Sequence, residues 1–439
     1  MLKKQNGKII NYVKEILKEK PSFKKGDLSH LADYVLSRAD KIKRITNNHR
    51  TPFYIFDEAA LDKSIDLFVS AFNKEIPSFK AYYAIKINHY GPIVERVVKK
   101  GMGLDVASQR EIAIAIASGC KDIVYFSPGK TEEDLMCALK YSKFIILNID
   151  SFSELEKLGE LTNKHKKKIR VGVRIHVDFH GDWQKYGINI EDLSKFWAKA
   201  QKYPFIKMQG IHFHTSRNKN ADFYEKTIKK IGLYLKKNFN KKNLSMIKYV
   251  DFGGGFEPYE AEGYYPHKTL QGSIIKSVNS YYGKETDFGY PYYILDSIKI
   301  EEYAKRIGIA IAKYLSPIIE ASYYSEPGRI ICNDSMLIAL SVADIKDANN
   351  IILDGGVNMV GWQRFESEYF PLVNISSPGK KEVKCRMWGS LCTTWDIWGY
   401  YCYSSKIKEH DIIIVPNQGA LTYSLAQNFI QSIPSVYKI

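Results

Sequence analysis

The feature that most constrains the fold is a long alternation of short apolar runs with amphipathic stretches, from about residue 50 to residue 330. The apolar runs are rich in β-branched and aromatic residues, whereas a stretch such as SQREIAIAIASG has helical periodicity. This pattern predicts repeated βα units around a parallel sheet, and closure into a (β/α)8 TIM-type barrel is the natural architecture. Candidate strands lie at 52–56, 80–86, 103–108, 122–127, 144–149, 169–177, 209–215 and 247–254, with a last one before the segment SEPGR.

The remaining segments divide the chain further. Residues 1–50 are basic and are expected to form a helical extension with a lead-in strand. Residues 257–300 are rich in Gly, Pro and Tyr and interrupt the barrel rhythm, so they are predicted to be an insertion or a lid. After residue 330 the helical period largely disappears. We therefore predict an α/β barrel domain at 51–330 and a mainly-β domain at 331–439.

The chain is basic, with 64 Lys and Arg residues against 48 Asp and Glu, and a formal net charge of +16. This balance alone suits nucleic acid, an anionic membrane surface or an acidic small molecule. No basic stretch is interleaved with aromatic residues, as binding of single-stranded nucleic acid requires. We expect no nucleic-acid partner.

Cysteine usage and hydropathy indicate the compartment. The cysteines form no C-x-x-C pair, so neither a zinc site, nor any other metal site, nor a disulfide framework is expected. Reduced thiols are typical of the cytosol. No uncharged apolar run approaches the ~18 residues of a membrane span, and the charged N-terminal segment contains no apolar signal core. We expect a cytoplasmic protein without a membrane segment.

Unusual residues stand where the predicted strands end, which is where a (β/α)8 barrel gathers its reactive groups. Lys86 and His214 each end an apolar strand, and the run Gly253 to Gly255 follows another. Glu326 and Arg329 lie in SEPGR after the last strand.

Each of these residues also has a structural interpretation. Lys86 could simply emerge into solvent, and the glycine run could form a tight turn instead of a phosphate cradle. SEPGR could be a surface turn. His212 is expected to be a structural histidine that points to the face opposite His214.

Taken together, the residues meet the needs of pyridoxal phosphate. Lys86 offers an amine, and a desolvated amine among Tyr82, Tyr83 and Ile85 would have its charged form disfavoured. The glycine run offers backbone N–H groups for a phosphate. Glu326 could pair with the pyridine nitrogen of the cofactor, and the flat imidazole of His214 could stack on its ring.

At this point the sequence resembles the alanine-racemase-fold decarboxylases, the group that contains diaminopimelate, ornithine, arginine and carboxynorspermidine decarboxylases. The resemblance spans most of residues 50 to 430. It runs in order through TPFYIFDEAAL, YYAIKIN, GLDVASQREI, FSPGK, NIDSFSELEKL, VGVRIHV, KYGI, GIHFH, DFGGGF, SEPGR, ILDGGVN, GSLC and NQGA. An ordered series of this length is far more specific than any one of its motifs.

The resemblance implies a role for each matching residue. Lys86 would bind the cofactor as a Schiff base, His214 would stack on its ring and Glu326 would pair with its ring nitrogen. Cys392 would come from the second subunit of a homodimer and take part in protonating the product, so that the site spans a two-fold interface. The remaining cofactor residues implied are Asp105, Glu111, Arg174, Gly253, Gly254, Gly255 and Arg329.

Three departures bear on the substrate. The acid that usually follows the cysteine is Thr393 here, and Asp396 is a candidate substitute. Arg217 stands where relatives have a small residue, and an arginine there could hold a carboxylate or a phosphate. Leu421 replaces a tyrosine that usually touches the phosphate, for which nearby Tyr423 is the candidate replacement. The candidate substrate ligands are Arg217, Arg364 and Asp396.

Decarboxylation of an amino acid is the leading functional hypothesis. The substrate expected is like diaminopimelate, or a modified or carboxylate-tailed diamino acid. An amino-acid racemase shares the fold, but the Cys392 segment favours the decarboxylase branch. A non-catalytic relative that regulates an enzyme through protein contacts is the alternative from another class.

Overall fold

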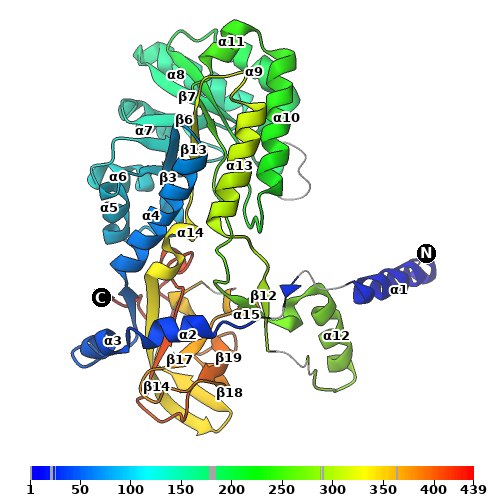
Figure 1. The fold of residues 1–439 in the computed structure, drawn as a ribbon, viewed down its shortest axis with the longest axis vertical. Coiled ribbons are helices and arrows are strands. Elements are labelled where there is room, and N and C mark those ends of the chain that lie inside the picture. Colours follow the sequence, from blue (N-terminus) through cyan, green and yellow to red (C-terminus); the bar gives the residue numbers. More distant parts are fainter. Residues whose placement is uncertain are drawn as a thin grey trace.

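The structure is a computed structural model that describes residues 2–19, 23–24, 26–176, 184–286, 288, 291–361 and 364–439. It consists of a barrel and a second, mainly-β region, which lie one above the other in Figure 1. Within the described part of the chain, no helix combines the length and apolarity needed to cross a membrane.

The barrel is a closed ring of parallel strands, as predicted. Neighbouring strands pair in sequence, and β6 pairs with β7 while β13 pairs with β3 to close the ring. The strands are β3 (Phe79–Ala84), β4 (Gly103–Val106), β5 (Ile123–Tyr125), β6 (Ile145–Ile149), β7 (Ile169–His176), β9 (Ile206–His212), β10 (Tyr249–Asp251) and β13 (Ser322–Ser325). A two-residue strand, β8 (Ile188–Asn189), adds to β7.

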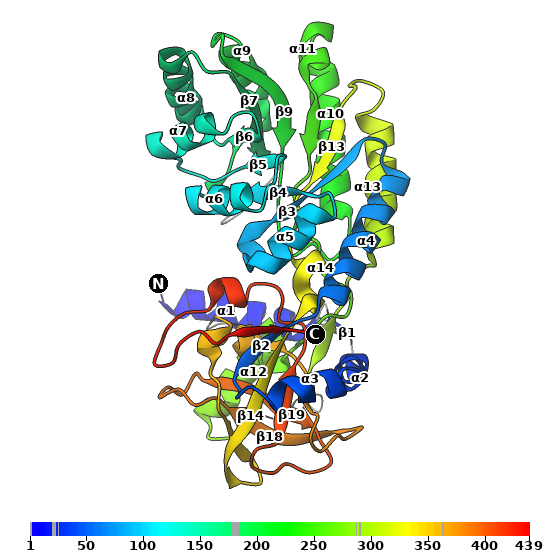
Figure 2. The ribbon, with the colours of Figure 1, turned by 90° about the vertical axis from the view of Figure 1, so that its left-hand side faces the viewer.

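Helices surround the ring, and Figure 2 shows them outside the strands. Several of them have N-cap residues whose side chains accept a hydrogen bond from a backbone N–H group of the first turn. Examples are Ser108 before α6, Thr131 before α7 and Ser151 before α8. The helices are α4 (Glu58–Glu75), α5 (Gly91–Lys99), α6 (Gln109–Ala117), α7 (Glu132–Lys140), α8 (Phe152–His165), α9 (Leu193–Ala200), α10 (Asp222–Asn238), α11 (Lys241–Met246) and α13 (Ile300–Tyr314).

A cluster of tyrosines fills the barrel interior. The rings of Tyr249 and Tyr324 stack with centroids 4.8 Å apart, and Tyr82 packs against Tyr324. A Cβ at Gly210 would come within 1.8 Å of the Tyr249 ring, so only glycine leaves room for it. Since Tyr249 is the first residue of its strand, this cluster closes the barrel below the strand ends that carry the functional groups.

The strand predicted at 52–56 does not belong to the barrel, and that prediction is wrong. It is β2 (Phe53–Phe56), which pairs with β14 and β21 in a mixed eight-stranded sheet. Its residues are all buried, but burial does not reveal which sheet a strand joins. The other strands of this sheet are β14 (Met336–Asp347), β15 (Asn350–Leu353), β17 (Leu372–Asn374), β18 (Glu382–Trp388), β19 (Ile397–Tyr403), β20 (Ile412–Val415) and β21 (Val436–Lys438).

The segment predicted as an insertion lies beside the second sheet. It forms β11 (Gly263–Tyr264), α12 (Leu270–Tyr281) and β12 (Tyr293–Leu295), and β11 pairs with β16 (Glu368–Tyr369). β12 pairs in turn with β1 (Phe23–Lys24) of the N-terminal extension. The helices of that extension are α1 (Leu2–Lys18), α2 (Ser29–Leu36) and α3 (Ala39–Thr46). Figure 1 shows α1 and α12 projecting on the same side of the molecule.

Candidate active site

The predicted strand-end residues meet at one cavity of about 710 Å³, which is lined by the barrel and by residues of segments 360–368 and 420–427. Two short helices bring residues to it: Lys86 lies in η1 (Ile85–Ile87) directly after β3, and Arg329 begins α14 (Arg329–Cys332) after β13. The lining residues used below are Lys86, His214, Arg217, Gly255, Glu257, Glu326, Arg329, Glu368 and Leu421.

Lys86 reaches into the cavity and forms an ion pair with a buried carboxylate. Its Nζ lies 2.7 Å from Oδ2 of Asp105, at the end of β4. Burial alone would lower the pKa of Lys86, but the carboxylates of Asp105 and Glu326 outweigh it and raise the pKa to about 12. Desolvation thus disfavours the charged amine, as expected, but the neighbouring carboxylates reverse its effect on the pKa.

Glu326 is buried between two histidines. Its carboxylate oxygens lie 3.4 Å from Nε2 of His212 and 3.4 Å from Nδ1 of His214. Burial opposes ionisation, but His212 and the charge of Lys86 outweigh it and hold the pKa of Glu326 well below its usual range. The expectation that His212 points to the face opposite His214 is therefore wrong, because residues two apart on an extended segment share a face.

Both histidines are neutral. Burial lowers the pKa of His214 to about 4, and it also lowers the pKa of His212. The backbone N–H of Gly254 donates to Nδ1 of His214 over 3.0 Å, which places the ring proton on Nε2. His214 thus offers the cavity a flat, uncharged ring. Together with Glu326, the two histidines bring ligand atoms within 4.8 Å of one another, a grouping that could also hold a metal ion.

Arg174 and Glu111 lie outside the cavity, and each forms a hydrogen bond with a backbone group of a segment that carries a site residue. Arg174 is buried in β7, donates to the carbonyl of His214 over 3.2 Å and lies over the rings of Phe126 and Tyr186. Glu111 accepts a hydrogen bond of 2.7 Å from the backbone N–H of Ala107, in the loop that follows Asp105. Burial raises the pKa of Glu111. Both residues therefore support the site without lining the cavity.

The three glycines allow backbone segments to approach closely. A Cβ at Gly254 would lie 2.1 Å from the carbonyl oxygen of Glu326, and one at Gly255 would lie 2.0 Å from that of Thr215. Gly253 and Gly255 also have positive φ angles of 68° and 90°. The turn thus needs glycine for its own packing, and it places Gly255 at the cavity wall.

Arg329 is held by two glutamates that the sequence analysis did not single out. Its guanidinium donates to Oε1 of Glu257 over 2.6 Å and forms a second ion pair with Glu262. All three side chains are largely buried. Both acids follow the glycine run, in EPYEAEG, and two glutamates so close to a predicted strand end were the signal available in the sequence.

Arg217 joins the barrel to the small four-stranded sheet β1-β12-β11-β16. It has a positive φ of 57°, and its guanidinium lies 3.2 Å from Oε1 of Glu368 in β16. Glu368 is buried, whereas 66% of the Arg217 side chain is exposed. Arg217 therefore lies at the cavity with its charge accessible, as the sequence suggested.

Other residues predicted for the site do not line this cavity. Tyr423, in η7 (Tyr423–Leu425), packs edge-on against Tyr54 and Tyr90 and does not line the cavity. Asp396, the candidate substitute for the missing acid, has a buried carboxylate that accepts backbone N–H groups of Val357 and Leu391, and it lines the same hollow as Cys392.

Cys392 is exposed in the β18–β19 loop, at a shallow hollow separate from the Lys86 cavity. Arg364 begins α15 (Arg364–Ser367), and its side chain lies outside the described residues.

The residues at the cavity fit pyridoxal phosphate. Glu326 is 97% buried, and its Oε1 has no hydrogen-bond partner among the described residues, so it can accept one from a protonated ring nitrogen. Lys86 can take the aldehyde, and His214 can cover a ring face. Fold and site together define a barrel enzyme built around a lysine, a buried carboxylate and a neutral imidazole.

Comparison with known proteins identifies the family. Residues 63–333 match the family model described as "Pyridoxal-dependent decarboxylase, pyridoxal binding domain". The chain belongs to this family, and it is a pyridoxal-phosphate-dependent decarboxylase.

Individual relatives are distant but nearly full-length. The chain is 23% identical to diaminopimelate decarboxylase of Aquifex aeolicus over 88% of its length and 86% of the relative. It is 24% identical to L-glutamyl-[BtrI acyl-carrier protein] decarboxylase of Niallia circulans, over 88% and 87%. Diaminopimelate decarboxylase from Helicobacter pylori, solved with L-lysine, superposes with a TM-score of 0.73 at 22% identity, over 90% of this chain and 93% of that one. This likeness confirms the barrel with a second β domain.

Proposed function

We propose that this enzyme decarboxylates an amino acid and that Lys86 is the residue to which the cofactor is bound covalently. The observation that carries the proposal is the convergence of Lys86, Glu326 and His214 on one cavity at the strand ends. Bound there, pyridoxal phosphate supplies an aldehyde for amines and a ring that accepts the electron pair left when CO2 departs.

The chain's own residues prepare that chemistry through charge. An ionised Glu326 favours a proton on a ring nitrogen placed against it, because a buried carboxylate stabilises a nearby cation. Arg174 and Gly254 fix His214 in one orientation and one tautomer. Asp105 holds the amine of Lys86 at one place until the aldehyde takes it over.

Return of a proton to the product is assigned to Cys392 of a second subunit. Within one chain Cys392 lies at a hollow separate from the cavity, so its thiol can act there only if a neighbouring copy supplies it. We therefore propose a homodimer whose sites span a two-fold interface.

The substrate class follows from the charges at the cavity. Arg217 is accessible and can turn from Glu368 to a substrate carboxylate, a bidentate partner that suits a guanidinium. The acid that would bind a distal amine is replaced by Thr393, and the carboxylate of Asp396 already accepts two backbone N–H groups. We propose a diaminopimelate-like or carboxylate-tailed amino acid, and diaminopimelate is the substrate in the name of one relative.

The test is release of CO2 from a panel of carboxyl-labelled amino acids: diaminopimelate, glutamate, ornithine, lysine and arginine. We expect release from a carboxylate-tailed member, at least a hundredfold less in Lys86→Ala, and a preference for such members that weakens in Arg217→Ala. Lys80→Ala is the matched control, because Lys80 lies on β3, the strand that leads to Lys86, and pairs with Asp122 at 2.9 Å. Release only from ornithine, lysine or arginine would overturn the substrate class.

A further inference from the structure

Arg329 is paired with two carboxylates, and only one of them lines the active-site cavity within the described part of the chain. Nη1 of Arg329 donates to Oε1 of Glu257 over 2.6 Å, and Nη2 forms an ion pair with Glu262. Glu257 is the acid that lines the cavity beside Arg329. Burial opposes the charge of Arg329, but Glu262, Glu257 and Glu368 outweigh it and hold the pKa of Arg329 above its ordinary value. An anion that approaches Arg329 from the cavity therefore meets the carboxylate of Glu257.

The other cation at this end of the cavity also has an acidic partner. Arg217 lies 3.2 Å from Glu368, which lines the cavity as well. Among the described residues, neither guanidinium here lacks a carboxylate partner. These carboxylates are buried, and buried charges act on one another through a low effective dielectric. A phosphate group at this end therefore has to compete with an acid for its cation.

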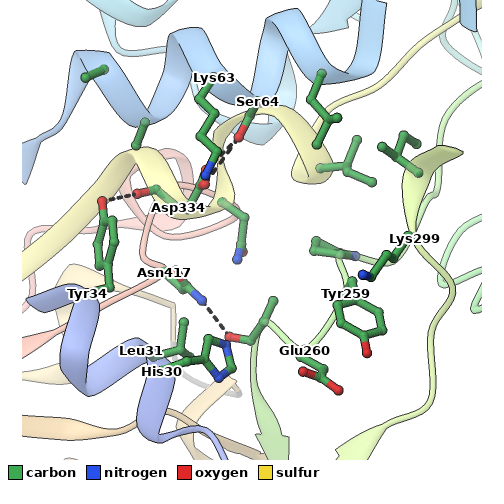
Figure 3. Close-up of a pocket in the computed structure, with 18 of the residues that line it drawn as sticks. His30, Leu31, Tyr34, Lys63, Ser64, Tyr259, Glu260, Lys299, Asp334 and Asn417 are labelled. Atoms are coloured by element: carbon green, nitrogen blue, oxygen red, sulfur yellow. Dashed lines mark hydrogen bonds between the residues drawn. The ribbon is translucent and has the colours of Figure 1, made fainter. Parts of the chain in front are cut away.

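The backbone that follows Glu257 is anchored. The hydroxyl of Ser297 donates to the carbonyl of Pro258 over 3.0 Å. The side chain of Asn417 donates to the carbonyl of Ala261 over 2.7 Å, a bond that Figure 3 shows in a second cavity on this side of the barrel, of about 760 Å³. Because the backbone is held at both points, Glu257 moves away from Arg329 mainly by rotation of its own side chain.

We propose that Glu257 sets the affinity of the active site for the phosphate group of pyridoxal phosphate, by competing with that group for the guanidinium of Arg329. This role rests on the proposed function, with the phosphate at the glycine turn beside Arg329, as the family resemblance implies. The carboxylate of Glu257 disfavours the phosphate, whereas Lys86, His214 and Glu326 serve the aldehyde and the ring. Glu257 acts through Arg329 and is therefore a positioning residue.

The test compares the dissociation constants of pyridoxal phosphate and pyridoxal, which share a ring and an aldehyde and differ in the phosphate. Both are measured by equilibrium dialysis against the full-length protein with Lys86→Ala, so that no covalent bond masks the phosphate end. The readout is the ratio of the two constants, which expresses the preference for the phosphate. We expect Glu257→Gln, which keeps the size of the side chain, to raise this preference at least tenfold.

Control variants separate this role from others. Glu368→Gln removes the acid that pairs with Arg217, and the preference should rise less than threefold. Glu257→Ala, which removes the carboxylate altogether, should raise the preference as Glu257→Gln does. Failure of Lys86 to bind the aldehyde would not change these values, because they are measured without its amine. An unchanged or lower preference in both Glu257 variants, or an equal rise in Glu368→Gln, would overturn the proposal.

Discussion

Lys86 forms an ion pair of 2.7 Å with Asp105, and this pairing governs when the amine can react. The pKa of Lys86 is raised to about 12, so the amine is protonated at all ordinary pH values until its surroundings change. Attack on an aldehyde requires the neutral amine. The carboxylate that positions the lysine therefore also restrains it.

Asp105→Asn should release that restraint. With the largest opposing carboxylate gone, burial lowers the pKa of Lys86, and the pH midpoint for attachment of pyridoxal phosphate should fall by at least about one unit, equivalent to about 1.4 kcal/mol. The measurement is the rate of borohydride-trapped adduct formation against pH. Asp122→Asn, which removes the partner of Lys80, is the control. An unchanged midpoint would show that Asp105 does not set the pKa.

For single residues, the sequence predicted which side chains meet at the site but not all of the residues with which they pair. Lys86, His214, Glu326 and Arg329 are identifiable because strand ends share one face of a barrel. The pairing of Lys86 with Asp105, and of Arg329 with Glu257 and Glu262, depends on side-chain distances between separate segments. His212 could have been assigned correctly from the two-residue period alone.

Among the elements, the segment after β10 connects the barrel to the rest of the molecule. It supplies Glu257 and Glu262 to Arg329 and then continues into β11, which pairs with β16 in a small four-stranded sheet. The insertion is thus part of the wall of the active site. Its lid role was an interpretation of composition, which does not record what a segment pairs with.

Arg329→Met should destabilise the protein strongly. It leaves Glu257 and Glu262 buried without a cation, a loss of about 3–5 kcal/mol for a broken buried ion pair. Urea unfolding of the full-length protein is the measurement. The triple variant Arg329→Met, Glu257→Gln and Glu262→Gln should recover much of that stability, because no uncompensated charge remains. A triple variant no more stable than the single one would contradict this account.

The burial of β2 explains why it was wrongly predicted to be a strand of the barrel. A short, fully buried strand has no alternation to report its neighbours, and β2 precedes the barrel in sequence while pairing with β14 and β21. The true barrel strands were predicted because they alternate with helices, a pattern that states their connectivity as well as their type.

In the whole molecule, the proposed active site needs two copies of the chain, one for Lys86 and one for Cys392. Mixing inactive Lys86→Ala with inactive Cys392→Ser should restore activity, because one of the two sites in each mixed dimer receives an intact Lys86 and an intact Cys392. Random reassortment predicts up to about a quarter of the wild-type activity. The assay is CO2 release after joint refolding or subunit exchange. Mixtures no more active than the separate variants would contradict a shared site.

Attachment of the cofactor to Lys86 is tested by borohydride reduction of the protein with pyridoxal phosphate, followed by peptide mapping. We expect a visible absorption band at ~420 nm that reduction abolishes, with the added mass on the peptide that contains Lys86. Lys80→Ala should behave like the wild type, and Lys86→Ala should lack both the band and the label. A label on another lysine, or a band that persists in Lys86→Ala, would contradict it.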